Sequence, residues 1–180
     1  MNTDMNLGVS ERLQPILAAV RAFIKERVLP VDEEFLEEVG NGDRWTLTAR
    51  QTEILEGLKS KAREQGLWNF WLTDSERGPG LTTVEYAYIA EETGRAHIAA
   101  EAFNCSAPDT GNMEVLERYG TDAQKDQWLV PLFNGEIRSA YAMSEPAVAS
   151  SDATNISMSA VLENGEWVLN GEKTYISGAG

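Results

Sequence analysis

The sequence predicts an α+β fold with segregated layers. An N-terminal all-α helical domain is expected over residues 1–135, and the first part of an antiparallel β-domain over 136–180. Apolar residues recur at helical spacing as far as Gly135, and beyond it the apolar period changes to alternation. Two Asn-Gly dipeptides, at 164–165 and 170–171, then indicate hairpin turns between short strands.

Composition bounds the classes of function that this chain can serve. With 180 residues and 42% hydrophobic content, it can build a packed core. Its 29 acidic and 15 basic residues give a formal net charge of −14, which repels nucleic acid and anionic lipid surfaces. No apolar run approaches the ~18 residues of a membrane helix, and the N-terminus lacks the features of a targeting peptide. We therefore expect a cytoplasmic protein that binds neither nucleic acid nor a membrane.

The first helix is predicted over residues 12–29, where the apolar residues form one stripe. Pro15 is tolerated only in a first turn, so the helix is expected to begin near Gln14. Pro30 is expected to end the helix, because it has no N–H group and its ring clashes with the preceding turn. A short acidic helix and a glycine-containing loop should follow within residues 31–44.

Capping boxes predict where three later helices begin. Gly66 and Gly94 are expected to end the first and second of these, and Pro131 to weaken the last turn of the third, which covers 121–133. A further helix is predicted over 109–119, and an aromatic loop with a Gly78-Pro79-Gly80 turn lies between the first two. The three capping boxes are Thr48 with Gln51, Thr82 with Glu85, and Thr121 with Gln124.

After Gly135 the sequence predicts strands. The stretch "IRSAYAMSE", residues 137–145, can form one strand, which Pro146 should stop. Residues 156–162 alternate as in a half-buried strand. With its two Asn-Gly turns, segment 155–177 is typical of a three-stranded antiparallel meander. Such a sheet has an unpaired edge, which native proteins usually avoid, so we expect the chain to be a fragment.

Several familiar kinds of site find no support in the sequence. His97 is the only histidine, so a His-rich metal site is excluded, and a surface or capping role is expected for it. Cys105 is the only cysteine and is expected to be a buried structural thiol. No GxGxxG or Walker pattern is present. Adjacent carboxylates are expected to serve solubility on charged helix faces; they are Glu33-Glu34, Glu37-Glu38 and Glu91-Glu92.

The stretch "YAMSEPAVASSDATNI", residues 141–156, differs from the rest of this acidic chain. It is almost uncharged and rich in hydroxyls and small side chains. A strand that stops at Pro146 leaves backbone N–H groups that need acceptors. An uncharged heteroaromatic ring edged with acceptors, such as an isoalloxazine, would satisfy them. The alternative is a Ser/Thr-rich loop capped by its own hydroxyls, and composition alone does not choose between the two.

The same stretch resembles the acyl-CoA dehydrogenase signature, a strand that ends in Thr/Ser-Glu-Pro before a small-residue loop and Ser-Asp. Downstream, "LNGEKTYISGAG" is similar to the family's Asn-Gly-x-Lys-x-Trp-Ile-Thr strand. Upstream, "REQGLWNFWL", "EYAYIAEETGRA" and "ERYGTDAQKDQWLVPLFNGEIRSAYAMSEP" resemble its helical N-terminal domain. The forms "SEPAVASSDATN" and "NCSAPDTGNMEVL" are similar to a subgroup whose animal members are fused to a phosphotransferase-like kinase domain.

The resemblance implies an acyl-CoA dehydrogenase-like fold and an FAD-dependent enzyme of fatty-acid β-oxidation. Such enzymes oxidise an acyl-CoA thioester to the trans-2-enoyl-CoA with hydride transfer to flavin N5. Electrons usually pass on to an electron-transfer flavoprotein, and the subunits form dimers or tetramers. The catalytic base is expected in a C-terminal helical bundle that this chain lacks, so no catalytic residue and no metal ligand is assigned within it.

Carried over residue by residue, the resemblance implies that Tyr141, Met143 and Ser144 line the flavin. Tyr175, Ile176 and Ser177 match the Trp-Ile-Thr segment that packs on the ring. Ser150 or Ser151 would contact the acyl-CoA, and the longer loop leaves open which of them does so. Compared with the family's usual residues, Ser replaces Thr at 144 and 177, and Tyr replaces Trp at 175.

Two other functions remain open from the sequence. One is a related flavin oxidase or monooxygenase on the same fold, which rapid reoxidation of the reduced flavin by air would indicate. The other is a non-catalytic module that binds an acyl thioester or a protein partner, which a colourless purified protein would favour.

Overall fold

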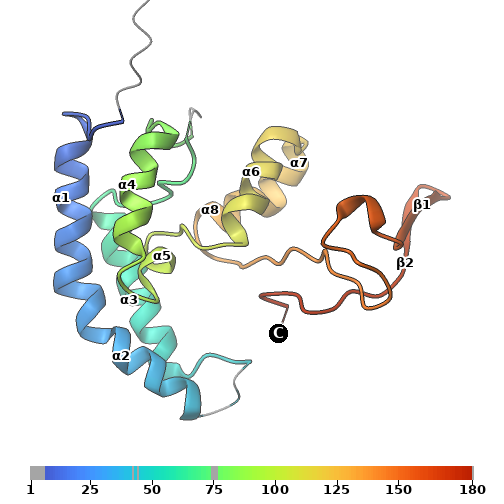
Figure 1. Cartoon of the computed structure of the whole chain (residues 1–180), viewed down its shortest axis with the longest axis horizontal. Helices are drawn as coiled ribbons and strands as arrows, with labels where there is room; N and C mark the ends of the chain where they lie inside the picture. Colours follow the sequence, from blue (N-terminus) through green and yellow to red (C-terminus); the bar gives the residue numbers. More distant parts are fainter. Residues whose placement is uncertain (1–6, 42, 44, 74–76, 180) are drawn as a thin grey trace, which may run out of the picture.

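In the computed structural model, helices occupy one end of the molecule and a small β-hairpin the other (Figure 1). The structure describes residues 7–41, 43, 45–73 and 77–179. Helices come first in the chain and strands last, as predicted, so the α+β class with segregated layers is confirmed. Among the described residues, no helix is long and apolar enough to cross a membrane.

Pro30 does not end the first helix, contrary to the sequence prediction. α1 (Leu13–Phe23) passes through a π-helical turn at Ile24–Val28 into α2 (Leu29–Glu37), and a 3₁₀ turn at Glu38–Asn41 follows. Pro30 is the second residue of α2, where the wider π turn precedes it. Pro30 has no N–H group for the i→i−4 hydrogen bond of a regular helix, and its ring would clash with the carbonyl of residue i−4. The wider π turn takes that carbonyl away from the ring.

The same arrangement occurs again at Pro131. α7 (Asp122–Gln124) continues through a π-helical turn at Lys125–Leu129 into α8 (Val130–Phe133), and Pro131 is the second residue of α8. The predicted helical stretch 121–133 is therefore confirmed, and its irregularity lies in the turn before the proline. Both prolines are accommodated in a helix that bulges, so neither acts as a stop.

All three predicted capping boxes are present. α3 (Ala49–Glu64), α4 (Thr83–Thr93) and α7 each begin with a threonine hydroxyl that accepts from the backbone N–H three residues later. Gly66 ends α3 with φ +70°, and Leu67 N–H donates to Ala62 C=O at 2.9 Å. That bond is typical of a Schellman motif, which needs a left-handed residue at the glycine position. Gly94 follows the last residue of α4.

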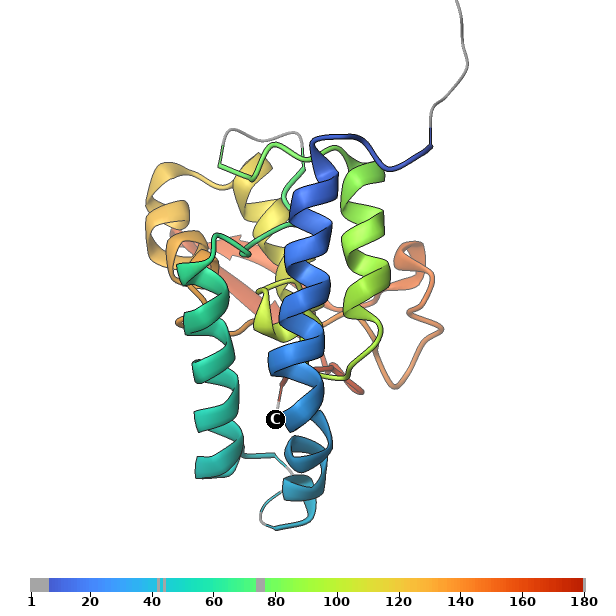
Figure 2. The same cartoon turned by 90° about the vertical axis from the view of Figure 1, so that its left-hand side faces the viewer.

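The hydrophobic core lies between the helices. Buried apolar side chains run from Leu13 to Leu132 in the described chain, and α5 (Ala99–Ala102) lies among the larger helices (Figure 2). Phe103 packs between Phe23 and Phe70, with ring centroids 5.2 and 5.8 Å away. α6 (Asp109–Tyr119) matches the prediction for 109–119. Of the aromatic loop, Asp74–Glu76 lie outside the described residues.

The β-layer is smaller than predicted. β1 (Ser159–Glu163) and β2 (Glu166–Asn170) pair antiparallel, with Val161 opposite Val168. The turn between them has φ values of +52° and +86° at Asn164 and Gly165, which confirms the first predicted Asn-Gly turn.

Three strand predictions are wrong. Residues 137–145 and 172–177 are not part of a ladder within the described chain, and β1 is exposed on both faces instead of half-buried. Alternation of apolar residues indicates which faces a strand can bury, but it does not supply the neighbour that pairs or covers it. Within the described chain, β1 has one partner strand, β2.

Candidate functional site

Two segments outside the helices and strands, 137–145 and 171–177, run past each other between the helices and the hairpin (Figure 1). Thr174 N–H donates to Ser144 C=O at 2.9 Å, and this is the one backbone–backbone hydrogen bond between them in the described structure. Each segment carries three of the residues that the sequence analysis assigned to a flavin.

A cavity of about 330 Å³ brings all six of those residues together. Tyr141, Met143 and Ser144 line it from one segment, and Tyr175, Ile176 and Ser177 line it from the other. Ala107 and Pro108, just before α6, complete the wall. Every lining residue is uncharged, in a chain whose formal net charge is −14.

The cavity offers donors rather than charges. In the described structure the backbone N–H groups of Tyr141, Met143 and Ser144 donate to no protein acceptor. Tyr141 is 64% exposed and Tyr175 95% exposed, while Met143, Ser144 and Ile176 are half-buried. Available N–H groups, the Ser144 and Ser177 hydroxyls and apolar surface suit a flat neutral ligand with acceptor atoms on its edge.

Tyr175 has a left-handed backbone conformation, with φ +53°. This region is uncommon for a bulky residue and costs on the order of 1–3 kcal/mol. Strained residues of this kind cluster at ligand-binding sites. The strain therefore lies in the wall of the cavity, at the position where the sequence analysis expects a ring-packing aromatic side chain.

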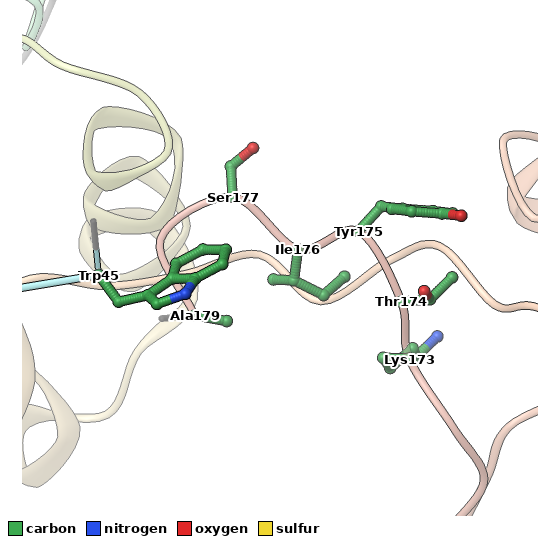
Figure 3. A pocket seen from close by; sticks show the side chains of 7 residues that line it. All are labelled: Trp45, Lys173, Thr174, Tyr175, Ile176, Ser177 and Ala179. Carbon is green, nitrogen blue, oxygen red and sulfur yellow. The ribbon is translucent and has the colours of Figure 1, made fainter. Parts of the chain in front are cut away.

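A second cavity, of about 550 Å³, lies along the same segment. Residues 173–177 and Ala179 line it, and Trp45 from the loop before α3 closes one end. Figure 3 shows the Trp45 indole beside Ala179, with the Tyr175 ring at the other end of the row and turned away from it. Tyr175, Ile176 and Ser177 thus border both cavities.

A buried ion pair joins the two cavity-lining segments. The Lys173 ammonium donates to Glu145 Oε1 at 2.8 Å and to the Met143 carbonyl at 2.9 Å. Glu145, whose side chain is 3% exposed, also accepts from Met158 N–H at 3.0 Å. Its other oxygen accepts from the Ser157 N–H and hydroxyl, at 2.8 and 2.7 Å. Each carboxylate oxygen therefore accepts two hydrogen bonds.

These partners change the ionisation of Glu145. The Lys173 ammonium and the Ser157 donors lower the pKa of Glu145 from its ordinary 4.5 to about 2, although desolvation acts in the opposite direction. The carboxylate is consequently ionised at neutral pH and stays paired with Lys173.

The two serines proposed for substrate contact differ in position. Ser150 is buried, and its hydroxyl accepts from Glu145 N–H, so it closes the turn from 145 to 150. Ser151 is exposed. Asp152 then accepts from Thr154 N–H at 3.0 Å and begins a short 3₁₀ turn, Ala153–Asn155. The loop is thus partly capped by its own side chains, while the segment before it keeps its N–H groups available.

Asp109 connects the helices to the cavity. This residue, the first of α6, accepts from Ser139 N–H at 2.7 Å, from the Ser139 hydroxyl at 2.6 Å and from Arg138 Nε at 2.6 Å. Arg138 also pairs with Glu101 at 2.9 Å, and Glu101 pairs with Lys59 on α3 at the same distance. The start of the segment that leads to Tyr141 is therefore held by a partly buried ionic network.

The sequence analysis did not identify Glu145, Lys173, Asp109 or Trp45 as part of the site. Glu145 and Lys173 lie inside the two quoted motifs, and the structure buries Glu145 and leaves Lys173 partly buried, with side chains 3% and 17% exposed. Each motif also holds an exposed carboxylate, Asp152 or Glu172, so charge alone did not single out the buried pair. Trp45 carried no signal, because it reaches the site from a loop that is distant in sequence.

The structure confirms the predictions for Cys105 and His97 and corrects the one for Glu92. Cys105 is buried, and burial raises the pKa of its thiol to about 12. His97 is exposed, and its ring lies 3.0 Å from Asp32 at the surface. Glu92, however, is not a solvated residue: it is buried and accepts from Arg21 of α1 at 2.7 Å. A run of charges does not reveal which side of α4 packs against α1.

No group of three or more His, Cys, Asp or Glu side chains in the described chain is placed to hold a metal ion.

The chain shows extensive similarity to known proteins. The family described as "Acyl-CoA dehydrogenase, N-terminal domain" matches residues 10–136. Acyl-CoA dehydrogenase family member 10 of Mus musculus is 48% identical over 176 residues, which cover 95% of this chain and 16% of that protein. This similarity is to the animal relatives that the sequence analysis singled out.

Solved structures agree with the sequence relatives. A putative acyl-CoA dehydrogenase from Mycobacterium abscessus has a TM-score of 0.83 at 49% identity, over 94% of this chain and 43% of that chain. An acyl-CoA dehydrogenase complexed with FAD from Bacillus anthracis has a TM-score of 0.62 at 29% identity, over 96% and 27%. The chain therefore spans less than half of the length of each protein that it matches here.

Proposed function

The chain belongs to the acyl-CoA dehydrogenase family, and we propose that it carries the flavin-binding part of an FAD-dependent acyl-CoA dehydrogenase. The reaction is the α,β-dehydrogenation of an acyl-CoA thioester to the trans-2-enoyl-CoA. Bound FAD supplies the acceptor for the hydride that leaves the β-carbon. The observation that carries the proposal is the cavity that brings six separately predicted residues together from two segments.

The residues present fit an isoalloxazine. The ring is flat and neutral, with carbonyl and nitrogen acceptors on its edge, and the cavity presents uncharged walls, two serine hydroxyls and available N–H groups. Tyr141, Met143 and Ser144 would hold the ring edge through backbone N–H groups and the Ser144 hydroxyl. Tyr175 and Ile176 would pack on the ring, and the Ser177 hydroxyl would donate near N5. A relative of known structure contains FAD, which supports the same assignment.

The remaining assignments extend the proposal. Ser151 is better placed than Ser150 to contact the acyl-CoA, because the Ser150 hydroxyl is buried in the 145–150 turn. No residue of this chain is proposed as the base that removes the α-proton. We further propose a cytoplasmic homodimer or homotetramer in fatty-acid β-oxidation that passes electrons to an electron-transfer flavoprotein.

Anaerobic titration tests the proposal. The complete enzyme, with the C-terminal half in which the catalytic base is expected, should contain FAD as purified, and butyryl-, octanoyl- or longer acyl-CoA should bleach its flavin absorbance in the absence of oxygen. Residues 1–180 alone should not turn over acyl-CoA. Slow reoxidation by air together with fast reoxidation by an artificial acceptor is the result expected of a dehydrogenase. Fast reoxidation by air would instead assign the protein to the oxidases or monooxygenases. A colourless protein that binds acyl-CoA without turnover would refute the proposed activity.

A further inference from the structure

We infer that Glu145 and Lys173 are positioning residues of the cofactor site, and that their ion pair sets the direction of the Ser144 N–H in the cavity wall. The inference rests on the proposed function, because it concerns how this chain presents its donors to the flavin. It assigns a task to two charged residues that do not themselves line the 330 Å³ cavity.

The pair lies next to the residues that line the cavity. Glu145 directly follows Ser144, and Lys173 precedes Tyr175 by two positions. The Glu145–Lys173 contact of 2.8 Å and the Thr174–Ser144 backbone bond of 2.9 Å are neighbours along both segments. Together they fix the register in which Tyr141–Ser144 and Tyr175–Ser177 meet, and in that register the two segments line the cavity.

Lys173 also acts directly on the backbone. Its ammonium holds the Met143 carbonyl at 2.9 Å. That carbonyl and the Ser144 N–H belong to one planar trans peptide, so the two groups point in opposite directions. When Lys173 draws the carbonyl to its own side, the Ser144 N–H must point away from Lys173. Ser144 N–H is one of the donors proposed for the flavin edge, and in the described structure it donates to no protein acceptor.

The next peptide is fixed as well. The Ser144 carbonyl accepts from Thr174 N–H, and the Glu145 N–H donates to the Ser150 hydroxyl. The Glu145 carboxylate then binds Ser157 and Met158, where the chain enters β1. The 143–144 peptide is therefore held at its carbonyl and the 144–145 peptide at both its carbonyl and its N–H, without a strand ladder to hold them.

An ion pair is a demanding way to join two segments if stability alone is required. Replacing a buried ion pair with well-packed apolar residues is often neutral or stabilising, so such a pair is weak evidence for stability. A positional role explains its use here, because a single ammonium reaches a side-chain acceptor and a backbone acceptor at defined distances. Preorganised donors of this kind bind ligands better than mobile ones.

Variants of the FAD-loaded protein test the inference. Lys173→Met removes the ammonium, and the double variant Glu145→Gln with Lys173→Met removes both charges, so that no buried charge is left unpaired. Glu172→Gln is the matched control, because Glu172 is the exposed neighbour of Lys173. Lys173→Arg keeps the charge and should give an intermediate result. The readouts are the FAD dissociation constant, the midpoint potential of the bound flavin and the thermal unfolding of the apoprotein.

The expected result separates positioning from general stability. Supporting residues around metal sites typically contribute roughly 10–100-fold in affinity or activity, and by analogy we expect FAD affinity to fall by about tenfold or more in Lys173→Met and in the double variant. The flavin midpoint potential should also shift, while the apoprotein of the double variant unfolds at the temperature of the parent. Glu172→Gln should match the parent in all three readouts.

Two results would overturn the inference. One is an FAD affinity and a midpoint potential that do not change in Lys173→Met or in the double variant. That result would leave the proposed function intact. The other is a loss of affinity that only parallels a fall in the unfolding temperature of the apoprotein. If the parent protein itself binds no FAD, the proposed function fails, and the positioning role fails with it. If Lys173→Met alone does not fold, the double variant decides.

Discussion

Replacing Asp109 with Asn should loosen the attachment of the cavity-lining segment to the helices. Asp109 is buried at the start of α6, and its carboxylate accepts three hydrogen bonds from Arg138 and Ser139. An asparagine has nearly the same size, but it keeps one acceptor oxygen and turns the other position into a donor. Both Ser139 donors share Oδ1, so the asparagine oxygen can keep them, while its NH2 group faces the Arg138 donor. The change therefore removes the charge and the Arg138 bond without creating a cavity.

The magnitude follows from these contacts. A hydrogen bond to a charged group contributes about 1.5–3 kcal/mol and a neutral one about 0.5–1.5 kcal/mol, so each of the two Ser139 bonds should weaken by about 1–1.5 kcal/mol. The Arg138 side chain is 51% exposed, so its pairing counts for only about 0–1 kcal/mol. The sum predicts that the free energy of unfolding falls by about 2–4 kcal/mol.

Urea unfolding followed by tryptophan fluorescence measures this change. Asp122→Asn is a matched control, because Asp122 is also the first residue of its helix but is exposed. The control should cost only the interaction with the helix dipole, about 0.3–1 kcal/mol. If the two variants unfold at the same urea concentration, the Asp109 contacts do not hold the segment, and the argument from them fails.

Three further predictions concern stability, pH and reactivity. Gly57 is exposed within α3 and a Cβ there would meet no atom, so Gly57→Ala should raise the free energy of unfolding by about 0.5–1 kcal/mol. Gly66 has φ +70°, so Gly66→Ala should lower it. If both variants shift the thermal unfolding temperature in the same direction, this reasoning is wrong. The pKa of Glu145 is lowered from 4.5 to about 2, so its contribution to the free energy of unfolding is present above pH 4.5 and is lost as the pH falls towards 2. Acid unfolding of Glu145→Gln should lack this pH-dependent loss, and acid-unfolding curves identical to those of the parent would count against it. Ser177→Ala should slow flavin reduction by acyl-CoA, by less than the roughly 10²–10³ of an oxyanion donor, and an unchanged stopped-flow rate at full flavin content would remove Ser177 from the mechanism.

Local chemistry alone determined much of the helical part. Thr48, Thr82 and Thr121 begin helices because a hydroxyl three residues before a Glu or Gln satisfies N–H groups within one turn, which needs no distant partner. The Asn164-Gly165 turn is local in the same sense. The six cavity residues followed from motif resemblance, and the structure brings them together from two segments. That these residues bind flavin remains a prediction.

Tertiary structure decided whatever depends on a distant neighbour. Pro30 would stop a regular helix, but the helix continues through it because a π turn precedes it, and no single residue of the sequence predicts that turn. Residues 137–145 have the alternation of a strand, yet a ladder also needs a pairing segment at the correct distance, and here side chains such as Asp109 and Lys173 hold the backbone instead. Glu92 was predicted to be solvated and is buried, and Glu145 is buried as well. Arg21 and Lys173 pair with them from 71 and 28 residues away in the sequence. Sequence reports a residue's own preferences, whereas burial and pairing are properties of the contact, which only the folded chain defines.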